Sequence, residues 1–339
     1  MKKKIGFVDL DLEEKTYFKK YLKGHELIFA KDLKKSSLKK LSGVEILVCF
    51  VDDAVDKNVI DSLPSLEFIA TRSTGYNHID VKYAGSKKIG VSNVPVYGEN
   101  TVAEYTFALI LAVTRKIHLA IKRTHDEHSF KTDDLLQGFD LAKKTIGVIG
   151  YGSIGKHVVR IAKGFEMNIL VCTRHPDKKA AKKVGFRNVT LDNLLKHSDI
   201  VSLHIPYTKT NHHLMNLKKL SLMKKSAYLI NTARGAIVDT HALMKALRKK
   251  KIAGAALDVL EKECDVSEEC ALLKRKKVLS CDYTILRKNS RLMKMDNVLV
   301  SPHNAFNSIE ATNRILDVTA DNITGFVRGK KLNVVVAEN

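Results

Sequence analysis

Apolar residues recur in short runs along the first ninety positions, at 5–8, 27–30, 46–51 and 68–70. Polar segments with helical spacing separate these runs. Short apolar runs that alternate with amphipathic segments are typical of parallel β-strands joined by crossover helices. The first part of the chain is therefore predicted to form a small doubly wound unit.

A second alternation begins at residue 145, with apolar runs at 145–150, 168–172, 199–203, 227–230, 253–257 and 298–300. This pattern predicts a second parallel sheet, of the Rossmann type. Between the two alternations, residues 102–121 form a long apolar stretch that predicts one helix, with Thr101 as its candidate N-cap.

The segment 308–327 also has a helical pattern, and we expect this closing helix to pack on the first unit. The predicted fold class is α/β, with two doubly wound parallel-sheet domains and a cleft between them. The first domain is expected to be discontinuous, with residues 1–101 and 304–339. The second is expected to cover residues 102–303.

The composition agrees with two ordinary globular cores. The 339 residues exceed what one core usually organises, and 45% are hydrophobic and 28% charged. No apolar stretch is long enough to cross a bilayer, and the apolar run after Lys4 is too short for a secretory signal. We therefore expect a cytoplasmic protein without a membrane partner.

Cysteine and histidine positions give no indication of a metal site. The five cysteines, at 49, 172, 264, 270 and 281, lack CxxC spacing and are expected to be reduced. The pair His212-His213 belongs to no HExxH motif. We predict neither a disulfide framework nor a bound metal.

The net charge of +21 raises the question of a nucleic-acid partner. The lysines, however, are spread through the chain in short groups, and neither interleaved aromatic residues nor a recognised nucleic-acid motif accompanies them. We interpret the charge as a solvated lysine-rich surface and expect no nucleic-acid binding.

The segment Gly150-Tyr151-Gly152-Ser153-Ile154-Gly155 matches GxGxxG directly after an apolar run and at the start of a helical pattern. In that context Gly150 permits a tight turn, Gly152 lets the backbone approach a pyrophosphate, and Gly155 allows close packing of helix on strand. Together with Ser153 and Ile154 at the helix start, the glycines predict a dinucleotide-binding loop.

The end of the next predicted strand carries Thr173 and Arg174 instead of the acid that usually binds the ribose of NAD. A guanidinium at this turn suits a 2′-phosphate, so NADP(H) is favoured over NAD(H). The alternative is that Arg174 is merely solvated and that Asp177 reaches the ribose, in which case NAD(H) binds.

Three side chains suited to carbonyl reduction follow predicted strands: Arg234, Glu263 and His303. Such a reaction needs a cation for the substrate, an acid for the nascent alkoxide and a group that keeps this acid protonated. Each residue alone has an ordinary explanation at a protein surface. Their shared place at the carboxyl ends of strands, where ligands bind in open α/β folds, favours a joint site.

These motifs resemble those of the D-isomer-specific 2-hydroxyacid dehydrogenase family. The resemblance is carried by residues 147–155, 203–206, 231–239, 254–263 and 301–303. Residues 71–80, 93–97 and 302–306 are similar to the D-lactate dehydrogenase branch, which includes the vancomycin-resistance type. The resemblance covers nearly the whole chain and implies a flavodoxin-like substrate domain beside the Rossmann domain.

The resemblance also implies roles for individual residues. His303, kept protonated by Glu263, would donate the proton, and Arg234 would hold the substrate carboxylate. Backbone amides of Thr74 and Gly75 would form a second carboxylate clamp, and Tyr97 and Phe306 would shape the substrate pocket. The positions that would line the cofactor are His204, Pro206, Thr232, Ala233 and Asp258, the last near the nicotinamide amide.

The expected reaction is reduction of pyruvate to D-lactate by a homodimer, the dimer by analogy with the family. Two alternatives stay open. One is a reductase of glyoxylate, hydroxypyruvate or a branched 2-oxo acid, since one methylene changes discrimination by only about 1–3 kcal/mol. The other is a non-catalytic protein that resembles the family's transcriptional corepressors.

Overall fold

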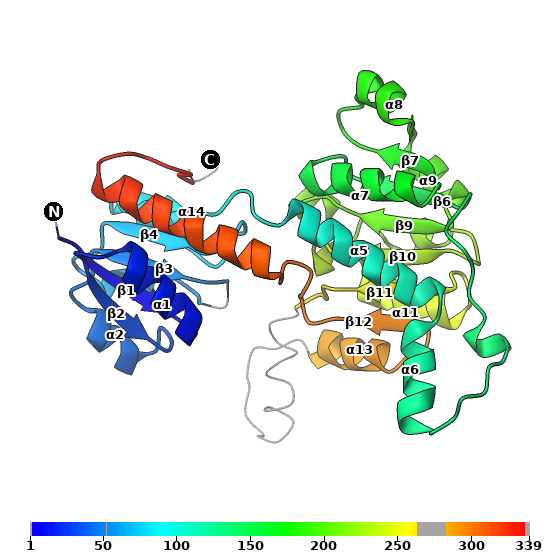
Figure 1. Ribbon diagram of the computed structural model, residues 1–339, viewed down its shortest axis with the longest axis horizontal. Coiled ribbons are helices and arrows are strands. Elements are labelled where there is room, and N and C mark those ends of the chain that lie inside the picture. Colours follow the sequence, from blue (N-terminus) through cyan, green and yellow to red (C-terminus); the bar gives the residue numbers. More distant parts are fainter. Residues whose placement is uncertain (1, 52, 263–282, 336–339) are drawn as a thin grey trace. The chain divides into compact units, whose positions relative to one another are not determined.

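The computed structural model describes residues 2–51, 53–262 and 283–335 of the chain (Figure 1). The chain forms two compact units, Met1–Tyr97 with Asn307–Asn339 and Gly98–Phe306. The two points at which the chain passes from one unit to the other thus lie a few residues from the positions 101 and 303 expected from the sequence.

The first unit contains a five-stranded parallel sheet in the order β2-β1-β3-β4-β5. Its strands are β1 (Lys4–Val8), β2 (Glu26–Ala30), β3 (Ile46–Cys49), β4 (Phe68–Thr71) and β5 (Gly90–Ser92). The first four of these strands were predicted from the sequence, and the structure confirms them. The sequence missed β5, because a three-residue strand with a single apolar side chain, Val91, has no periodic signal.

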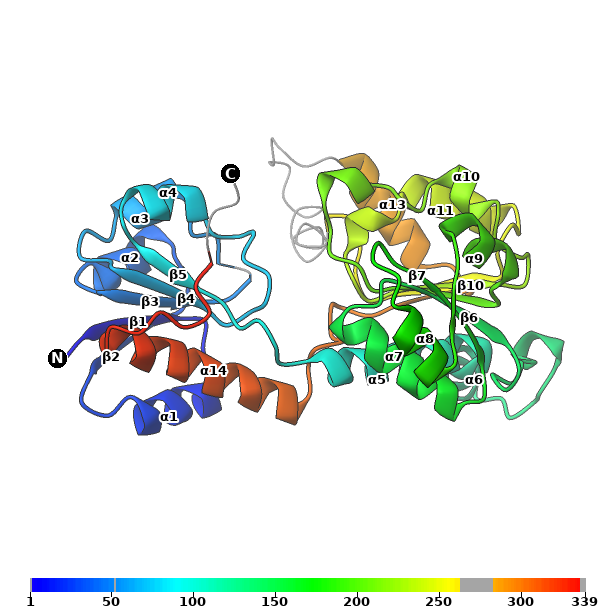
Figure 2. The same ribbon diagram turned by 90° about the horizontal axis from the view of Figure 1, so that it is seen from above.

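Helices cover both faces of this sheet (Figure 2). On one face lie α1 (Leu12–Tyr21) and the C-terminal helix α14 (Ile309–Val327), and on the other α2 (Lys35–Leu41), α3 (Lys57–Asp61) and α4 (Val81–Ser86). Leu316, Ala320 and Ile323 of α14 share one core with Ile5 and Phe7 of β1. The last helix therefore completes the core that the first strands begin.

The second unit contains a seven-stranded parallel sheet in the order β12-β11-β10-β9-β6-β7-β8. Its strands are β6 (Thr145–Ile149), β7 (Asn168–Cys172), β8 (Arg187–Asn188), β9 (Ile200–Leu203), β10 (Tyr228–Asn231), β11 (Gly254–Leu257) and β12 (Val298–Val300). The chain extends the sheet in one direction from β6 to β8 and then returns to place β9 on the other side of β6. This reversal is the topological switch point of a Rossmann fold.

Two layers of helices enclose the second sheet (Figure 2). One layer includes α5 (Glu99–Thr114) and α7 (Ser153–Gly164), and the other includes α9 (Leu191–His197), α10 (Leu217–Leu220), α11 (Thr240–Arg248) and α13 (Tyr283–Met293). The described part of the unit also contains the helices α6 (Ile117–Asp126) and α8 (Lys178–Val184) and the 3₁₀ turns η1 (Asp134–Leu136), η2 (Lys209–Asn211) and η3 (Gly235–Ile237). The predicted fold class is confirmed.

The single helix predicted over 102–121 is wrong in two respects. The helix begins earlier, at Glu99 after the N-cap residue Gly98, so Thr101 is not the N-cap. It also breaks after Thr114, where Lys116 adopts a left-handed backbone conformation with φ of 56°. A non-glycine residue seldom takes this conformation, and nothing in the local residue types announces it.

The expectations about cysteines, metals and membranes can be compared with the structure only over the described residues. Cys49 and Cys172 are free thiols, whereas the cysteines at 264, 270 and 281 lie outside the described residues. Across the described ranges, no group of three potential metal ligands gathers. Over the same ranges, no helix has the length and apolar character needed to cross a membrane.

Candidate active site

Two predicted catalytic residues, Arg234 and His303, lie at the carboxyl edge of the seven-stranded sheet. Arg234 follows the end of β10 at Asn231, and His303 follows the end of β12 at Val300. Strand β11 lies between these two strands, and both side chains are exposed. Glu263, predicted to act with His303, follows β11 and lies outside the described residues.

The turn that carries Arg234 is fixed by its neighbours. The Asn231 side chain accepts a hydrogen bond from the Ala233 N–H at 3.0 Å and donates one to the Arg234 carbonyl at 3.0 Å. Thr232 is buried, and its hydroxyl lies 2.9 Å from that of Thr106 on α5. The backbone that presents the guanidinium is therefore held by hydrogen bonds within the chain.

A close backbone approach links this turn to the loop after β11. A β-carbon added at Gly235 would lie 2.0 Å from the carbonyl carbon and oxygen of Leu260. Glycine is therefore required here on steric grounds. The approach brings the segment after Arg234 against the loop that leads to Glu263.

The buried carboxylate of Asp258, directly after β11, organises the His303 loop. It accepts hydrogen bonds from the Ser301 hydroxyl at 2.6 Å and from the backbone N–H groups of Asn304 at 2.8 Å and Ala305 at 2.9 Å. The His303 N–H donates to the Asp258 carbonyl at 2.9 Å. Burial raises the pKa of Asp258, and these hydrogen bonds oppose the shift. The sequence indicated a cofactor contact at Asp258 but not this anchoring of the loop.

Glu261 is a buried residue that the sequence analysis missed. One of its carboxylate oxygens lies 2.6 Å from Nε2 of His213, and the other accepts the Thr240 N–H at 3.0 Å. Its carbonyl accepts a hydrogen bond from Asn289 of α13 at 2.8 Å. The His213 and Glu261 positions are 48 residues apart, so no local pattern announces their pairing.

The glycine loop after β6 has the geometry that a dinucleotide requires. Gly150 has φ of 102°, and a β-carbon there would lie 2.2 Å from the carbonyl oxygen of His204. A β-carbon at Gly155 would lie 2.0 Å from the Gly150 carbonyl oxygen, whereas nothing lies within 4 Å of one at Gly152. The turn is tight, the space beside Gly152 is open, and Ser153 and Ile154 begin the twelve-residue helix α7. These features fit a pyrophosphate at a helix N-terminus.

His204 adds a buried polar group beside this loop. Its Nε2 lies 2.8 Å from the Ser202 hydroxyl, while its Nδ1 has no partner within the described parts of the chain. Burial lowers the pKa of His204 to about 3, so the ring is neutral at physiological pH. Pro206 follows on the exposed loop, where its carbonyl accepts a hydrogen bond from Asn211 at 2.7 Å.

The turn after β7 contains the residues that bear on cofactor choice. Thr173 is half-buried and Arg174 is exposed. Asp177, the acid considered as a ribose ligand, accepts the Ala180 N–H at 2.8 Å and caps α8. Its carboxylate is therefore engaged in the helix cap.

In the first unit, the loop after β4 carries Thr74 and Gly75. The Thr74 hydroxyl donates to the Val94 carbonyl at 2.7 Å, and the Ser73 hydroxyl donates to the Gly75 carbonyl at 2.6 Å. The backbone N–H groups of Thr74 and Gly75 have no acceptor among the described residues. Two neighbouring N–H groups of this kind suit a small anion.

The two residues predicted to shape the substrate pocket lie near the unit boundaries. Tyr97 is half-buried at the end of one segment of the first unit, and its carbonyl accepts a hydrogen bond from Arg314 at 2.6 Å. Phe306, also half-buried, ends the second unit.

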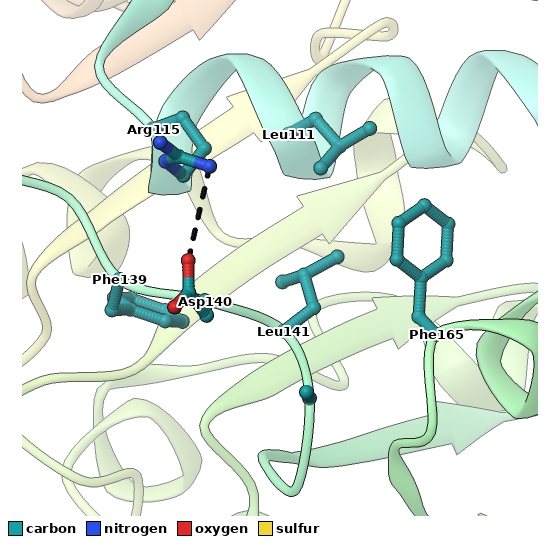
Figure 3. A pocket seen from close by; sticks show the side chains of 7 residues that line it. Leu111, Arg115, Phe139, Asp140, Leu141 and Phe165 are labelled. Atoms are coloured by element: carbon teal, nitrogen blue, oxygen red, sulfur yellow. Dashed lines mark ion pairs between the residues drawn. The ribbon is translucent and has the colours of Figure 1, made fainter.

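A small pocket of about 240 Å³ in the second unit contains none of the predicted site residues. Its lining comes from α5, the segment before β6, and Phe165 after α7 (Figure 3). Arg115 and Asp140 form an ion pair at 3.8 Å on its rim. This pocket is separate from the loops that carry Arg234 and His303.

A Rossmann unit with a glycine loop of this geometry, and with an arginine and a histidine at the same sheet edge, defines a nicotinamide-dependent oxidoreductase. Residues 107–305 match the family model described as the D-isomer specific 2-hydroxyacid dehydrogenase, NAD binding domain. The chain belongs to the D-isomer-specific 2-hydroxyacid dehydrogenase family, as the sequence motifs indicated. It is an oxidoreductase that acts on 2-hydroxy acids with a nicotinamide cofactor.

Individual relatives extend over most of the chain. A glyoxylate reductase of Thermococcus litoralis is 37% identical over 298 residues, which are 86% of this chain and 83% of that protein. The D-lactate dehydrogenase of Aquifex aeolicus, solved with NAD and lactic acid, has a TM-score of 0.85 and 35% identity over 99% of this chain and 100% of its own. The pyruvate reductase of Chlamydomonas reinhardtii has a TM-score of 0.87 and 30% identity, and 98% of each chain is covered.

Proposed function

We propose that this protein reduces pyruvate to D-lactate. The observation that carries the proposal is the placement of Arg234 and His303 at the carboxyl edge of the sheet whose glycine loop fits a dinucleotide. Two solved relatives are named for D-lactate or pyruvate chemistry, which favours this substrate. Residues 1–101 and 304–339 are assigned to substrate binding and residues 102–303 to cofactor binding.

The proposed mechanism divides the work among a few side chains. Gly150, Gly152 and Gly155 would hold the nicotinamide cofactor, which when bound would supply the hydride. Arg234 pairs with the substrate carboxylate and polarises the carbonyl, because a guanidinium offers two parallel donors to a carboxylate. His303 donates its proton to the carbonyl oxygen as the negative charge develops there. Glu263 is assigned to keep His303 protonated.

The remaining contacts follow from the same assignment. The N–H groups of Thr74 and Gly75 bind the carboxylate, while Tyr97 and Phe306 enclose the small side chain of the substrate. In the Rossmann unit, the residues that would hold the cofactor are Ser153, Ile154, His204, Pro206, Thr232 and Ala233. Asp258 would contact the nicotinamide amide, and its carboxylate also holds the His303 loop.

NADPH is the proposed preferred cofactor. Arg174 is exposed at the turn where a 2′-phosphate would lie, and Thr173 brings no negative charge. The engagement of Asp177 in the cap of α8 supports this preference, because no other acid follows β7 within the turn. We also propose a cytoplasmic location, the one expected from the sequence.

Glyoxylate is the second candidate substrate, because the relative from Thermococcus litoralis is named a glyoxylate reductase. Hydroxypyruvate and branched 2-oxo acids are tested with it. Pyruvate and glyoxylate differ by one methyl group, and a methyl group changes discrimination by only about 1–3 kcal/mol. The comparison of kcat/KM values therefore decides the physiological substrate.

The experiment follows the absorbance of the reduced nicotinamide with pyruvate, glyoxylate, hydroxypyruvate and a branched 2-oxo acid, for NADPH and NADH. We expect oxidation with pyruvate and a drop in kcat of about 10²–10⁴-fold in His303→Ala, the usual contribution of a general acid. The control is His197→Ala, which changes an exposed histidine at the end of α9. Cofactor binding without turnover of any 2-oxo acid would overturn the proposal in favour of a corepressor-like protein.

We further propose that the enzyme is a homodimer joined through the second unit. Apolar side chains are exposed together on α6 and the segment after it, where Ile121 is 53%, Phe130 92% and Leu135 60% exposed. Exposed apolar groups in such number favour a protein partner, and the family analogy makes that partner a second copy of the chain.

A further inference from the structure

Three asparagines connect the C-terminal segment to the loop of Thr74 and Gly75 within the first unit. The side-chain amide of Asn333 donates to the Oδ1 atom of Asn322 at 2.8 Å. The Asn322 amide donates to the Asn93 carbonyl at 2.9 Å, and the Asn93 amide donates to the Thr74 carbonyl at 2.8 Å. The Asn93 N–H also donates to the Asn333 carbonyl at 3.2 Å, which closes the network.

These hydrogen bonds determine where the N–H groups of the loop point. In a trans peptide the carbonyl and the following N–H point in opposite directions. The Ser73 carbonyl is bonded to the Val94 N–H at 3.0 Å, and the Thr74 carbonyl is bonded to the Asn93 amide at 2.8 Å. The N–H groups of Thr74 and Gly75 are therefore both directed away from the segment of Asn93 and Val94.

Burial of the polar Asn322 side chain costs free energy, which its hydrogen bonds in the network must offset. Asn322 is 1% exposed on α14, a helix whose neighbouring Ala320 and Ile323 belong to the apolar core. A buried amide destabilises a protein unless it is hydrogen-bonded, and an aliphatic side chain would satisfy the packing alone. The polar residue at this position therefore serves the contacts that its amide makes.

Docking of the C-terminal segment does not depend on the Asn93 side chain. Val334 bridges Ser92 of β5, and the Val335 N–H donates to the Val91 carbonyl at 2.8 Å. These backbone contacts hold the segment against the sheet edge. The hydrogen bond from the Asn93 side chain to Thr74 thus adds nothing to that docking, but it fixes the peptide between Thr74 and Gly75.

We infer that Asn93 is a positioning residue for the substrate carboxylate, and that Asn322 and Asn333 hold it in place. The inference rests on the proposed function, because it takes the N–H groups of Thr74 and Gly75 as the carboxylate site. Asn93 touches neither substrate nor cofactor in this assignment. It acts by presetting the direction of the Gly75 N–H before the substrate arrives.

The test compares Asn93→Ala with Asn58→Ala, a control at an exposed asparagine on α3 of the same unit. We expect Asn93→Ala to raise the KM for pyruvate about 3- to 10-fold, the value of one hydrogen bond, with kcat little changed. The Kd of the reduced cofactor, measured by its fluorescence, is expected to stay the same. Asn322→Ala is expected to raise KM in the same direction.

Asn93→Asp keeps the shape of the side chain but cannot donate to the Thr74 carbonyl, so it provides a second variant if Asn93→Ala does not fold. Its expected rise in KM is larger, because the added negative charge also repels the substrate carboxylate. An unchanged KM in folded Asn93 variants, or an equal change in Asn58→Ala, would overturn the inference.

A second measurement separates this inference from the proposed function. If the parent protein turns over no 2-oxo acid, the proposed function fails, and hydrogen exchange then tests the inference alone. Asn93→Ala is expected to speed exchange of the Val94 N–H, which donates to the Ser73 carbonyl at 3.0 Å, without speeding exchange in β4. Equal exchange of the Val94 N–H in the parent and in Asn93→Ala would contradict the positioning role.

Discussion

At the scale of one residue, the backbone and the side chain of Arg234 have different roles. Its backbone is held by Asn231 and Gly235. The side chain is exposed and, within the part of the chain that the structure describes, donates to the carbonyl of its neighbour Ala233 at 2.7 Å. The turn is thus ordered and the charged group is accessible. Geometry, and not charge alone, should therefore set the contribution of this residue.

Replacing Arg234 by lysine tests this division of roles. Lysine keeps the positive charge but loses the planar fork that binds a carboxylate through two parallel hydrogen bonds. We expect kcat/KM for pyruvate to fall about 10²-fold, within the range for loss of one preorganised donor. Steady-state kinetics measure the effect, with Arg248→Lys at the exposed end of α11 as the control. A change below twofold would contradict the role of the fork.

His78 predicts a pH dependence of stability. Burial lowers its pKa from 6.5 to about 4, while its close neighbour, the Cys49 thiol at 3.9 Å, stays neutral because burial raises the pKa of that thiol to about 12. At pH values between about 4 and 6.5, His78 binds more protons in the unfolded chain than in the folded protein. Stability from this residue is therefore complete above pH 6.5 and decreases as the pH falls toward 4.

The measurement is the thermal midpoint of the parent and of His78→Gln between pH 7 and pH 5. Glutamine does not titrate, and its amide can still reach the Thr71 hydroxyl, which lies 3.1 Å from the His78 ring. We expect a smaller decrease of the midpoint with falling pH in the variant than in the parent. Parallel decreases in both proteins would argue against titration of His78.

For single residues, the sequence predicts the place of a side chain in the fold better than it predicts the residues that this side chain contacts. Arg234 and His303 could be placed because each follows a strand that the apolar pattern marks clearly. The partners of Glu261 and Asn93 could not be predicted, because His213 lies 48 residues from Glu261 and Asn322 lies 229 residues from Asn93 in the chain. Hydrogen bonds across such separations leave no periodic signal in one sequence.

At the scale of elements, close approaches between loops position the candidate site more directly than the helices do. The contact of Gly235 with the Leu260 peptide joins the turn after β10 to the loop after β11. It therefore couples the turn of Arg234 to the segment that precedes Glu263. The packing of two backbones leaves little freedom for either loop to shift alone.

Gly235→Ala is expected to disturb both loops. The added methyl group would meet backbone atoms at 2.0 Å, which must move, at a cost of about 1–3 kcal/mol in the free energy of unfolding. Denaturant unfolding measures this loss, and kcat/KM is expected to fall with it. Gly85→Ala on α4 is the matched control, because its β-carbon meets nothing within 4 Å and alanine favours a helix.

The prediction of elements fails where one residue overrides the pattern. Residues 115 and 116 are an arginine and a lysine, which are good helix formers, yet Lys116 is left-handed and ends the apolar helix. The strands β5 and β8 are too short for an apolar pattern. The remaining strands were predictable because both faces of each sheet are buried, which makes them continuous apolar runs.

At the scale of the whole molecule, the exposed apolar surface of α6 and the following segment predicts the oligomeric state. Phe130→Asp is expected to shift the protein from dimer toward monomer, since it places a charge in an apolar interface. Sedimentation velocity measures the shift. The control is Leu12→Asp, which changes a side chain 80% exposed on α1 of the first unit. A monomeric parent protein would disprove the dimer directly.

The discontinuity of the first unit has a consequence for synthesis on the ribosome. The stretch Gly98–Phe306 is continuous, so the Rossmann unit can fold while translation continues. The first ninety-seven residues emerge earlier but must wait for Leu316 and Ile323 to complete their core. Asn322 and Asn333 arrive in the same final stretch. A nascent chain can thus acquire its cofactor site well before the proposed carboxylate site, and translation itself sets the order in which the two become competent.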